Sequence, residues 1–287
     1  MEKIKFLSDS CCDISRAEAE EFGIEILPIL ILNGENIYED WYDFTPQEFY
    51  DSLKVWDDLP TTSQVSVEVF LRAFNRAYEE GYDVVIATLL NARASGTYQS
   101  ANIARGLFFE EERERAFRID VIDSAIYSFL YGGPLIEGVE LARAGASADE
   151  VVAHIVHRTQ KVCAYAVVYT LDYLQRTGRI NRVEGFVGKL LGIKPIIKLA
   201  DGEINAVEKI RGKKHSVTKL LEMAKRDSDP ADNTLYIVYA DMEGEVEELE
   251  AQVREYFPDH VIKRARLGSV ISVHAGPNLL GLGFYRK

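Results

Sequence analysis

The sequence is poor in cysteine and has no long apolar run. Its three cysteines include the adjacent pair Cys11 and Cys12, which excludes a disulfide framework and lacks the Cys-x-x-Cys spacing of zinc sites. No apolar run approaches the ~20 residues of a transmembrane helix, and the first apolar residues reach Ser8 and Asp9 too soon for a signal peptide. We therefore expect a cytoplasmic protein with reduced thiols and no stable insertion into a membrane.

Motifs of nucleotide binding and of serine hydrolases are also missing. The chain has no Gly-x-Gly-x-x-Gly after a strand, no Gly-x-x-x-x-Gly-Lys-Ser/Thr and no Gly-x-Ser-x-Gly. Basic residues are in the minority, since 33 Lys and Arg face 46 Asp and Glu, a formal net charge of -13. A surface of this sign repels nucleic acid. We expect neither a cofactor nor a nucleic-acid partner.

The remaining composition is that of an ordinary globular protein. Hydrophobic residues make up 47% and charged residues 28% of the 287 positions. At roughly 150 residues per domain, this length suits two domains or one large one. The texture of the sequence changes near residue 160, so we predict an N-terminal α/β domain (1–160) and a C-terminal α/β domain (161–287), with a soft boundary.

In the first part, short apolar runs alternate with helical patterns. Runs at Ile4–Leu7, Val84–Ala87 and Arg118–Ile122 are each followed by polar residues and then by a helical pattern. The run Ile24–Leu32 reaches Asn33-Gly34, a strong hairpin signal. The alternation favours an α/β fold with a mostly parallel, Rossmann-like sheet, in which ligands bind outside the carboxyl ends of the strands.

In the second part, strands and helices follow one another less regularly. We predict a smaller mixed α/β domain, in which Ile193–Leu199 and Ile204–Ile210 form strands and Ser216–Arg226 forms a helix. The apolar run Val270–Val273 is predicted as a strand. It would place His274 at the carboxyl edge of a sheet.

Two clusters of hydroxyl side chains stand out. Thr61, Thr62 and Ser63 precede a predicted helix, and the segment from Ser95 to Ser100 opens another. At helix N-termini, O–H and free N–H groups suit a carboxylate or phosphate, although such residues also serve as simple N-caps. The glycine after Ser95, Gly96, favours close approach of a ligand, because a cap does not require it.

Other candidates carry less local information. His274 can donate to an anion or act as a base, or it can be a loop residue without a role. Lys209–Lys214 is a basic segment before a helix, where cations oppose the helix dipole, so a phosphate or partner role competes with a solvated loop. His154 and His157 have the spacing of metal ligands, but we expect a surface helix rather than a metal site.

Short motifs from both halves form a recognisable series. They are Asp9-Ser10, Pro60-Thr61-Thr62-Ser63-Gln64, Ser95-Gly96-Thr97-Tyr98-Gln99-Ser100-Ala101, Asp123-Ser124, Gly178-Arg179-Ile180, Ile193-Lys194-Pro195, Lys209-Ile210-Arg211-Gly212 and His274-Ala275-Gly276-Pro277. In this order the chain resembles the DegV family of bacterial fatty-acid-binding proteins over essentially its whole length. The resemblance implies a two-domain α/β protein with one long-chain fatty acid buried between the domains. It also implies a non-catalytic protein, which in some members is the binding subunit of a fatty acid kinase and presents the carboxylate to a separate ATP-binding subunit.

The resemblance also implies roles for individual residues. The family's carboxylate-binding hydroxyls match Thr62, Ser63 or both in one motif and Ser95, followed by Gly96, in another. Its histidine matches His274. Arg179 and Arg211 match arginines that the family associates with the carboxylate region and the kinase partner. Arg93 stands where the family has no fixed residue, in the segment Asn91–Ala94 that departs from the family's Ser-Ser-x-Leu. It would add a charged contact or narrow the pocket.

Two other functions remain as alternatives. In a Ser/His-dependent hydrolase of a small acyl ester, Ser95 or Ser10 would be the nucleophile, His274 the base and Asp9 or Asp123 the group that orients it. A metal-dependent phosphatase would be built on Asp9 and Asp123. It lacks a clustered ligand motif.

Overall fold

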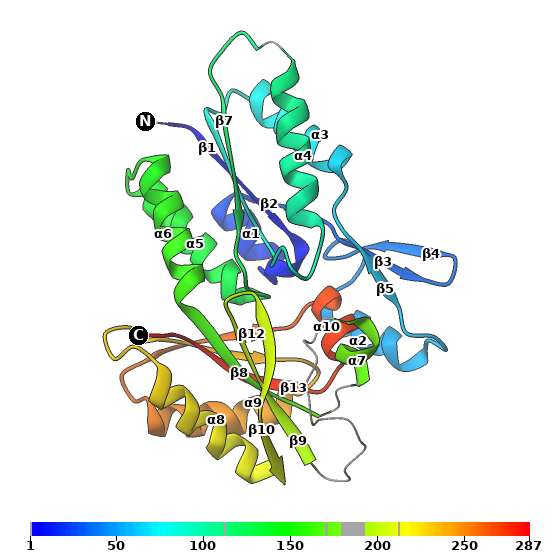
Figure 1. Cartoon of the computed structure of the whole chain (residues 1–287), viewed down its shortest axis with the longest axis vertical. Helices are drawn as coiled ribbons and strands as arrows, with labels where there is room; N and C mark the ends of the chain where they lie inside the picture. Colours follow the sequence, from blue (N-terminus) through cyan, green and yellow to red (C-terminus); the bar gives the residue numbers. More distant parts are fainter. Residues whose placement is uncertain (1, 112, 170–171, 179–192, 212) are drawn as a thin grey trace. The chain divides into compact units, whose positions relative to one another are not determined.

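The computed structural model describes residues 2–111, 113–169, 172–178, 193–211 and 213–287 (Figure 1). Contacts divide the chain into two compact units. The first unit comprises Met1–Thr45 and Asp57–Gln160, and the second comprises Pro46–Trp56 and Lys161–Lys287. The second unit thus includes a short segment from early in the chain, which no sequence pattern indicated. The domain limits 1–160 and 161–287 stay predictions.

The first unit is built on a parallel sheet. Its strands are β1 (Ile4–Asp9), β2 (Ile24–Leu27), β6 (Val84–Leu89) and β7 (Arg118–Asp123), in the order β2-β1-β6-β7. Every neighbouring pair is parallel. All six residues of β6 are buried, as expected for a central strand covered on both faces. The predicted parallel sheet is therefore confirmed.

Helices cover this sheet. They are the short 3-10 helix η1 (Ser10–Cys12), α1 (Arg16–Phe22), α3 (Val67–Glu79), α4 (Thr97–Glu110), α5 (Phe129–Arg143) and α6 (Ala148–Lys161). In Figure 1, α5 and α6 lie on one side of the sheet and α3 and α4 on the other. Local sequence sets the ends of α1, because Ser15 and Glu18 form a capping box and Gly23 ends the helix at φ +68°.

A small antiparallel sheet completes the first unit. It contains β3 (Leu30–Asn33), β4 (Asn36–Glu39) and β5 (Thr61–Ser63), in the order β4-β3-β5. The hairpin predicted at Asn33-Gly34 is confirmed. The apolar run Ile24–Leu32 does not form one strand, because it is divided between β2 and β3, which belong to different sheets. Pro28 lies between them, and it has no N–H with which to continue a strand ladder.

The second unit contains a mixed sheet. Its strands are β8 (Val162–Val168), β9 (Ile193–Ala200), β10 (Glu203–Arg211), β11 (Thr234–Tyr239), β12 (Val261–Arg266) and β13 (Leu279–Tyr285), in the order β10-β9-β8-β13-β11-β12. Only the pairing of β11 with β12 is parallel; the other pairs of this sheet are antiparallel. The helices of this unit are α2 (Pro46–Val55), α7 (Asp172–Thr177), α8 (Lys213–Asp227), α9 (Glu243–Tyr256) and α10 (Ser269–Ala275). The α/β class predicted for both parts of the chain is confirmed.

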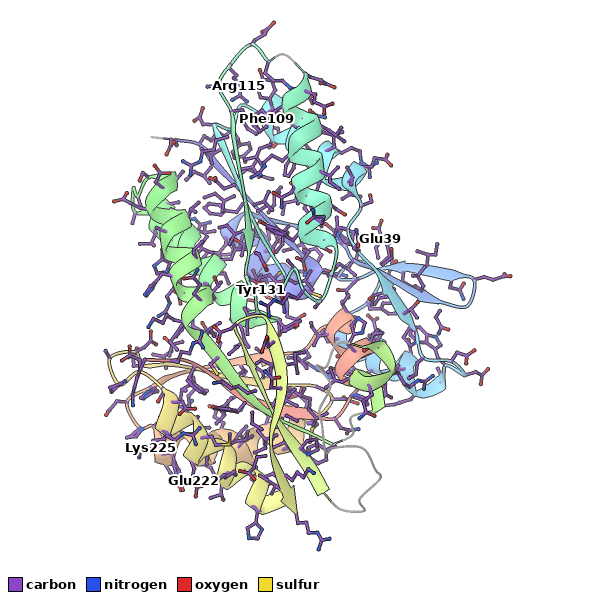
Figure 2. The ribbon with its side chains drawn as sticks, in the orientation of Figure 1. Glu39, Phe109, Arg115, Tyr131, Glu222 and Lys225 are labelled. Carbon is purple, nitrogen blue, oxygen red and sulfur yellow. The ribbon has the colours of Figure 1, made fainter. Side chains whose placement is uncertain are left out.

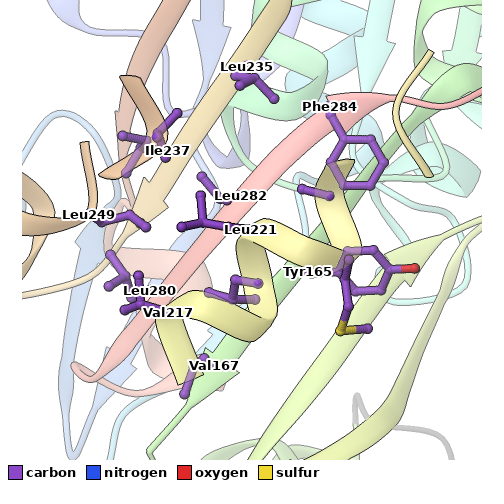
Figure 3. Packing of buried hydrophobic residues seen from close by; sticks show 14 of the residues in the cluster. Tyr165, Val167, Val217, Leu221, Leu235, Ile237, Leu249, Leu280, Leu282 and Phe284 are labelled. Carbon is purple, nitrogen blue, oxygen red and sulfur yellow. The ribbon is translucent and has the colours of Figure 1, made fainter. Parts of the chain in front are cut away.

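Alternate residues of three strands form the core of the second unit. In β13 these are Leu280, Leu282 and Phe284, and the same alternation runs along β8 and β11. They pack against apolar side chains of α8, such as Leu221, and of α9, such as Leu249 (Figure 3). The two-residue period places one face of the sheet against the two helices.

The predicted strand Val270–Val273 is wrong, because these residues lie in helix α10. A short apolar run fits a strand and a buried helix equally well, and tertiary contacts decide between them. Here Ser272 donates a hydrogen bond to the carbonyl of Gly268, 2.8 Å away, and lies 2.7 Å from the buried hydroxyl of Tyr50 in α2. The buried residues of α10 recur with a helical period.

Among the residues that the structure describes, no helix combines the length and the apolarity needed to cross a bilayer.

Candidate functional site

Polar residues gather at the carboxyl edge of the parallel sheet. Asp9 ends β1, Asp123 ends β7, and Asn91 follows β6 by two residues. Because the strands are parallel, these ends share one edge, as the sequence predicted. The loop after β6, which leads to Ser95, runs along this edge. The surrounding polar groups fix the conformation of this loop.

Asp9 is wholly buried and accepts three hydrogen bonds. Its Oδ2 accepts from the backbone N–H of Leu90 at 2.8 Å, and its Oδ1 accepts from the N–H of Cys11 at 3.0 Å and from the hydroxyl of Tyr131 at 2.8 Å. Tyr131 lies near the start of α5 (Figure 2). Burial raises the pKa of Asp9 to about 6, although the three donors act in the opposite direction.

The same loop is tied to β7 and to itself. Asp123 accepts hydrogen bonds from the N–H groups of Ala92 at 3.0 Å and Ala125 at 2.9 Å. Asn91 accepts one from the N–H of Arg93 at 3.0 Å through its side chain. Asp9 and Asp123, which the hydrolase and phosphatase alternatives would use in catalysis, thus position the loop before Ser95.

Ser95 lies at the start of α4, next to Thr97. Its Oγ is 3.0 Å from Oγ1 of Thr97 and accepts a hydrogen bond from the N–H of Thr97 at 3.3 Å. Gly96 is the N-cap of the helix. The sequence predicts that Gly96 permits close approach of a ligand. In the structure a side chain of the protein itself lies there, because a Cβ on Gly96 would be 1.9 Å from Oε1 of Gln64.

The other hydroxyl motif has a different local structure from the one predicted. Thr62 and Ser63 do not stand at the N-terminus of a helix; they lie in strand β5, paired with β3. The helix α3 begins four residues after Ser63, with Ser66 as its N-cap. Because this segment pairs with β3, it lies outside the helix. The cap oxygen of the helix comes from Ser66 and not from the hydroxyls further upstream.

The structure nevertheless brings the two hydroxyl motifs together within the first unit. The N–H of Val65 donates to Oγ1 of Thr97 at 3.4 Å, and Nε2 of Gln64 donates to Oγ of Ser100 at 2.8 Å. The end of β5 is therefore hydrogen-bonded to the first turn of α4. Donor groups from two segments that lie far apart in the sequence thus share one part of the surface, where Thr62 and Ser95 are half-buried and Ser63 is exposed.

The remaining predicted residues are distributed over both units. His274 is half-buried in the last turn of α10, in the second unit, and not after a strand as predicted. Two residues later Gly276 adopts φ +77°, and a Cβ there would meet the ring of Tyr173 at 2.7 Å. Arg93, in the first unit, and Arg211, at the end of β10, are exposed. Arg179 lies outside the described residues.

One of the two histidines on α6, His154, makes a structural contact. Nε2 of His154 lies 3.0 Å from Oε2 of Glu137, which also accepts a hydrogen bond from Arg158 at 2.8 Å. Within the described ranges, no group of three or more His, Cys, Asp or Glu side chains is arranged to hold a metal ion. These contacts join α5 to α6.

The sequence motifs contained Gln64 and Thr97 but assigned no role to them. A signal for Thr97 exists, since a serine and a threonine two residues apart at a helix start often form local hydrogen bonds. For Gln64 the related signal is the glycine at position 96, because the absence of a Cβ there leaves room for the Gln64 side chain. Tyr131 has no local signal at all, because its contact with Asp9 joins residues 122 positions apart.

Comparisons with known proteins agree over the whole chain. A family model described as "Uncharacterised protein, DegV family" matches residues 3–287. A DegV domain-containing protein of Caldanaerobacter subterraneus subsp. tengcongensis is 33% identical over 288 residues, which cover 100% of both chains. The predicted family resemblance is confirmed.

Solved structures show the same fold. A stearic acid-binding protein of Eubacterium ventriosum is 29% identical, with a TM-score of 0.89, covering 100% of this chain and 99% of that one. A DegV family protein of Thermus thermophilus, described for its fatty acid binding, is 28% identical with a TM-score of 0.88, covering 99% and 100%. Both are structures of proteins that bind fatty acids.

The buried Asp9 gives the protein a particular pH dependence. Its pKa is about 6 in the folded state against 3.8 unfolded, so the folded state binds this proton more tightly. The contribution of Asp9 to the free energy of unfolding therefore rises by about 3 kcal/mol as the pH falls from above 6 to below 3.8. Urea unfolding of the wild type and of Asp9→Asn between pH 7.5 and 4.5 should show about 2 kcal/mol of this change. The free energy of unfolding of the wild type should rise relative to that of Asp9→Asn on acidification, and a constant or falling difference contradicts the assignment.

The contact between Gln64 and Gly96 is tested by adding one methyl group. In Gly96→Ala the side chain of Gln64 must turn away and lose its hydrogen bond to Ser100. We expect a loss of about 1 kcal/mol in the free energy of unfolding. In a Gln64→Ala background the same change should cost little, since the clash is already gone.

Gly106→Ala, in the same helix, is the matched control. A Cβ on Gly106 meets nothing within 4 Å, so this change should stabilise the protein by roughly 0.5–1 kcal/mol. If Gly96→Ala keeps its full cost in the Gln64→Ala protein, the loss of stability does not come from the contact with Gln64.

Proposed function

Because the chain belongs to the DegV family, we propose that it binds a long-chain fatty acid and catalyses no reaction on it. The proposal is supported by the related proteins of Eubacterium ventriosum and Thermus thermophilus, which are described as binding stearic acid and fatty acid. The relationship covers the full length of each chain. It does not depend on one shared segment.

We propose that hydroxyl groups of Thr62, Ser63 and Ser95, with the backbone at Gly96 and the imidazole of His274, bind the carboxylate. For the residues of the first unit, the observation that carries this proposal is the hydrogen-bonded junction between the end of β5 and the first turn of α4. His274 is included because it matches the histidine of the family. The junction gathers several O–H and N–H donors at the carboxyl edge of a parallel sheet. Such donors bind an ionised carboxylate through charge-assisted hydrogen bonds, and the N-terminus of α4 adds a favourable dipole.

The acyl chain would supply most of the affinity. Burying an alkyl chain is worth about 0.8 kcal/mol per CH₂ group. A long chain is therefore held tightly even where its head group is bound weakly. The head group contacts then select among lipids that share the same hydrocarbon.

We further propose that the bound acid is presented to a separate ATP-binding kinase subunit, which forms the acyl phosphate. Arg93, Arg179 and Arg211 are the candidates for contact with the head group region or with this partner. Arg211 is exposed at the end of β10, which suits a contact with another protein. A guanidinium group binds carboxylates and phosphates in a bidentate manner.

The lipid-binding proposal is tested by mass spectrometry of an organic extract of the washed protein, beside native mass spectrometry of the intact chain. We expect one fatty acid per chain. Ser95→Ala and His274→Ala should each weaken binding of added fatty acid by ~1–3 kcal/mol, because the carboxylate loses a donor. Ser147→Ala, which removes a hydroxyl bonded to Glu150 at the start of α6, should bind like the wild type. An empty protein that also takes up no oleate or palmitate refutes the proposal.

The kinase proposal is tested by charge reversal at the surface. Arg211→Glu should leave fatty acid binding within about twofold of the wild type and weaken the complex with the ATP-binding subunit by roughly tenfold or more. Lys225→Glu, an equal charge change at an exposed site on α8, is the control and should leave both unchanged. Affinity for the subunit is measured by sedimentation or calorimetry. Loss of lipid binding in Arg211→Glu would instead place Arg211 at the carboxylate.

A further inference from the structure

Thr97 lies between two other donors in a chain of hydrogen bonds. It is the first residue of α4 and is 0% exposed. Its Oγ1 accepts from the N–H of Val65 at 3.4 Å and lies 3.0 Å from Oγ of Ser95. Its own N–H donates to Oγ of Ser95 at 3.3 Å. The direction of the hydroxyl pair decides what Ser95 can offer a ligand.

Burial fixes that direction. A hydroxyl has one proton to donate and two lone pairs that accept. If Ser95 donated to Thr97, the proton of the buried Thr97 hydroxyl would need a further acceptor, and among the described residues the hydroxyl oxygen of Ser95 is the acceptor that the structure provides. Leaving a buried donor without an acceptor is costly. Thr97 therefore donates to Ser95.

With this direction, the Ser95 hydroxyl can still form one hydrogen bond, as a donor. Its oxygen accepts both the N–H and the O–H of Thr97, so both lone pairs are occupied. Its own proton remains to be donated. Ser95 is half-buried and Thr97 is buried, so this proton is available to a group outside the helix. A donor of this kind fits an ionised carboxylate, which only accepts.

We propose that Thr97 is a positioning residue that makes Ser95 a dedicated donor to the ligand's carboxylate; this inference rests on the proposed function. The chain of donors runs from the N–H of Val65 through the hydroxyl of Thr97 to that of Ser95. Successive hydrogen bonds in one direction polarise each other. Thr97 thereby contributes to the preference for fatty acids over lipids with an uncharged head group.

The test compares palmitate with hexadecanol, which has the same hydrocarbon length and an uncharged head group. Dissociation constants are measured at pH 8 for the wild type, Thr97→Val, Thr97→Ser, Ser95→Ala and the double variant Ser95→Ala/Thr97→Val. Valine matches the shape of threonine but has no hydroxyl, whereas serine keeps the hydroxyl. Thermal unfolding checks that each variant is folded, and Thr97→Ala replaces Thr97→Val if valine prevents folding.

We expect Thr97→Val to weaken palmitate binding roughly 3- to 10-fold and to change hexadecanol binding by less than about twofold. Thr97→Ser should bind both lipids like the wild type. In the Ser95→Ala background, Thr97→Val should have less than about a twofold further effect, because the residue acts through Ser95.

Equal weakening of both lipids by Thr97→Val, or a full effect in the Ser95→Ala background, overturns the role of Thr97 and leaves the proposed function standing. A wild-type protein that binds neither lipid overturns the proposed function and this inference together. The two failures are thus seen in different proteins, the first in the variants and the second in the wild type.

Discussion

The first unit depends on a carboxylate placed wholly inside the protein. Asp9 ends the strand β1, and its oxygens hold the start of the loop after β6 and the hydroxyl of Tyr131 in α5. An ionised group in this position is stabilised only by the donors around it, since water does not reach it. Three elements are therefore fixed relative to each other by one side chain. The loop that leads to Ser95 inherits its position from this arrangement.

From the edge of the sheet outward, several polar groups are hydrogen-bonded within the protein. Asp123 and Asn91 hold the backbone of the loop. Gln64 and Val65, which follow β5, are hydrogen-bonded to the first turn of α4. Binding sites of this kind are organised before the ligand arrives, so less conformational entropy is lost on binding. In the arrangement that we infer for α4, Thr97 sets the direction of the Ser95 hydroxyl.

Sequence patterns predicted those parts of the fold that local chemistry determines. The parallel strands and the Asn33-Gly34 hairpin follow from apolar runs and from a turn signal that contains glycine. Patterns failed where distant contacts decide. The run Val270–Val273 became helical through packing that includes Ser272 and Tyr50, which lie 222 positions apart.

The candidate site divides in the same way. The hydroxyl motifs at Thr62 and Ser95 were found as short strings with a family resemblance, and their hydrogen-bonded junction confirms that they meet in one unit. The strand conformation of Thr62 could not be predicted, because it depends on pairing with Ile31 in β3. The contributions of His274, Arg179 and Arg211 stay predictions, since they rest on the resemblance. That of Arg93 stays a prediction from its place beside Ser95.

The early segment that belongs to the second unit limits how the chain can be divided. Helix α2 places Phe49 and Tyr50 among buried residues, and the hydroxyl of Tyr50 donates to the carbonyl of Leu267 at 3.1 Å. A fragment that ends near residue 160 would carry these two aromatic side chains without the residues that cover them. The fragment would expose an apolar surface that favours aggregation, and the second unit would lose a helix. No single cut in the polypeptide therefore yields both units complete, and circular permutation does not help, because segments of the two units still alternate when the ends are joined. A separable first unit would need Thr45 linked directly to Asp57, with α2 transplanted to the second unit.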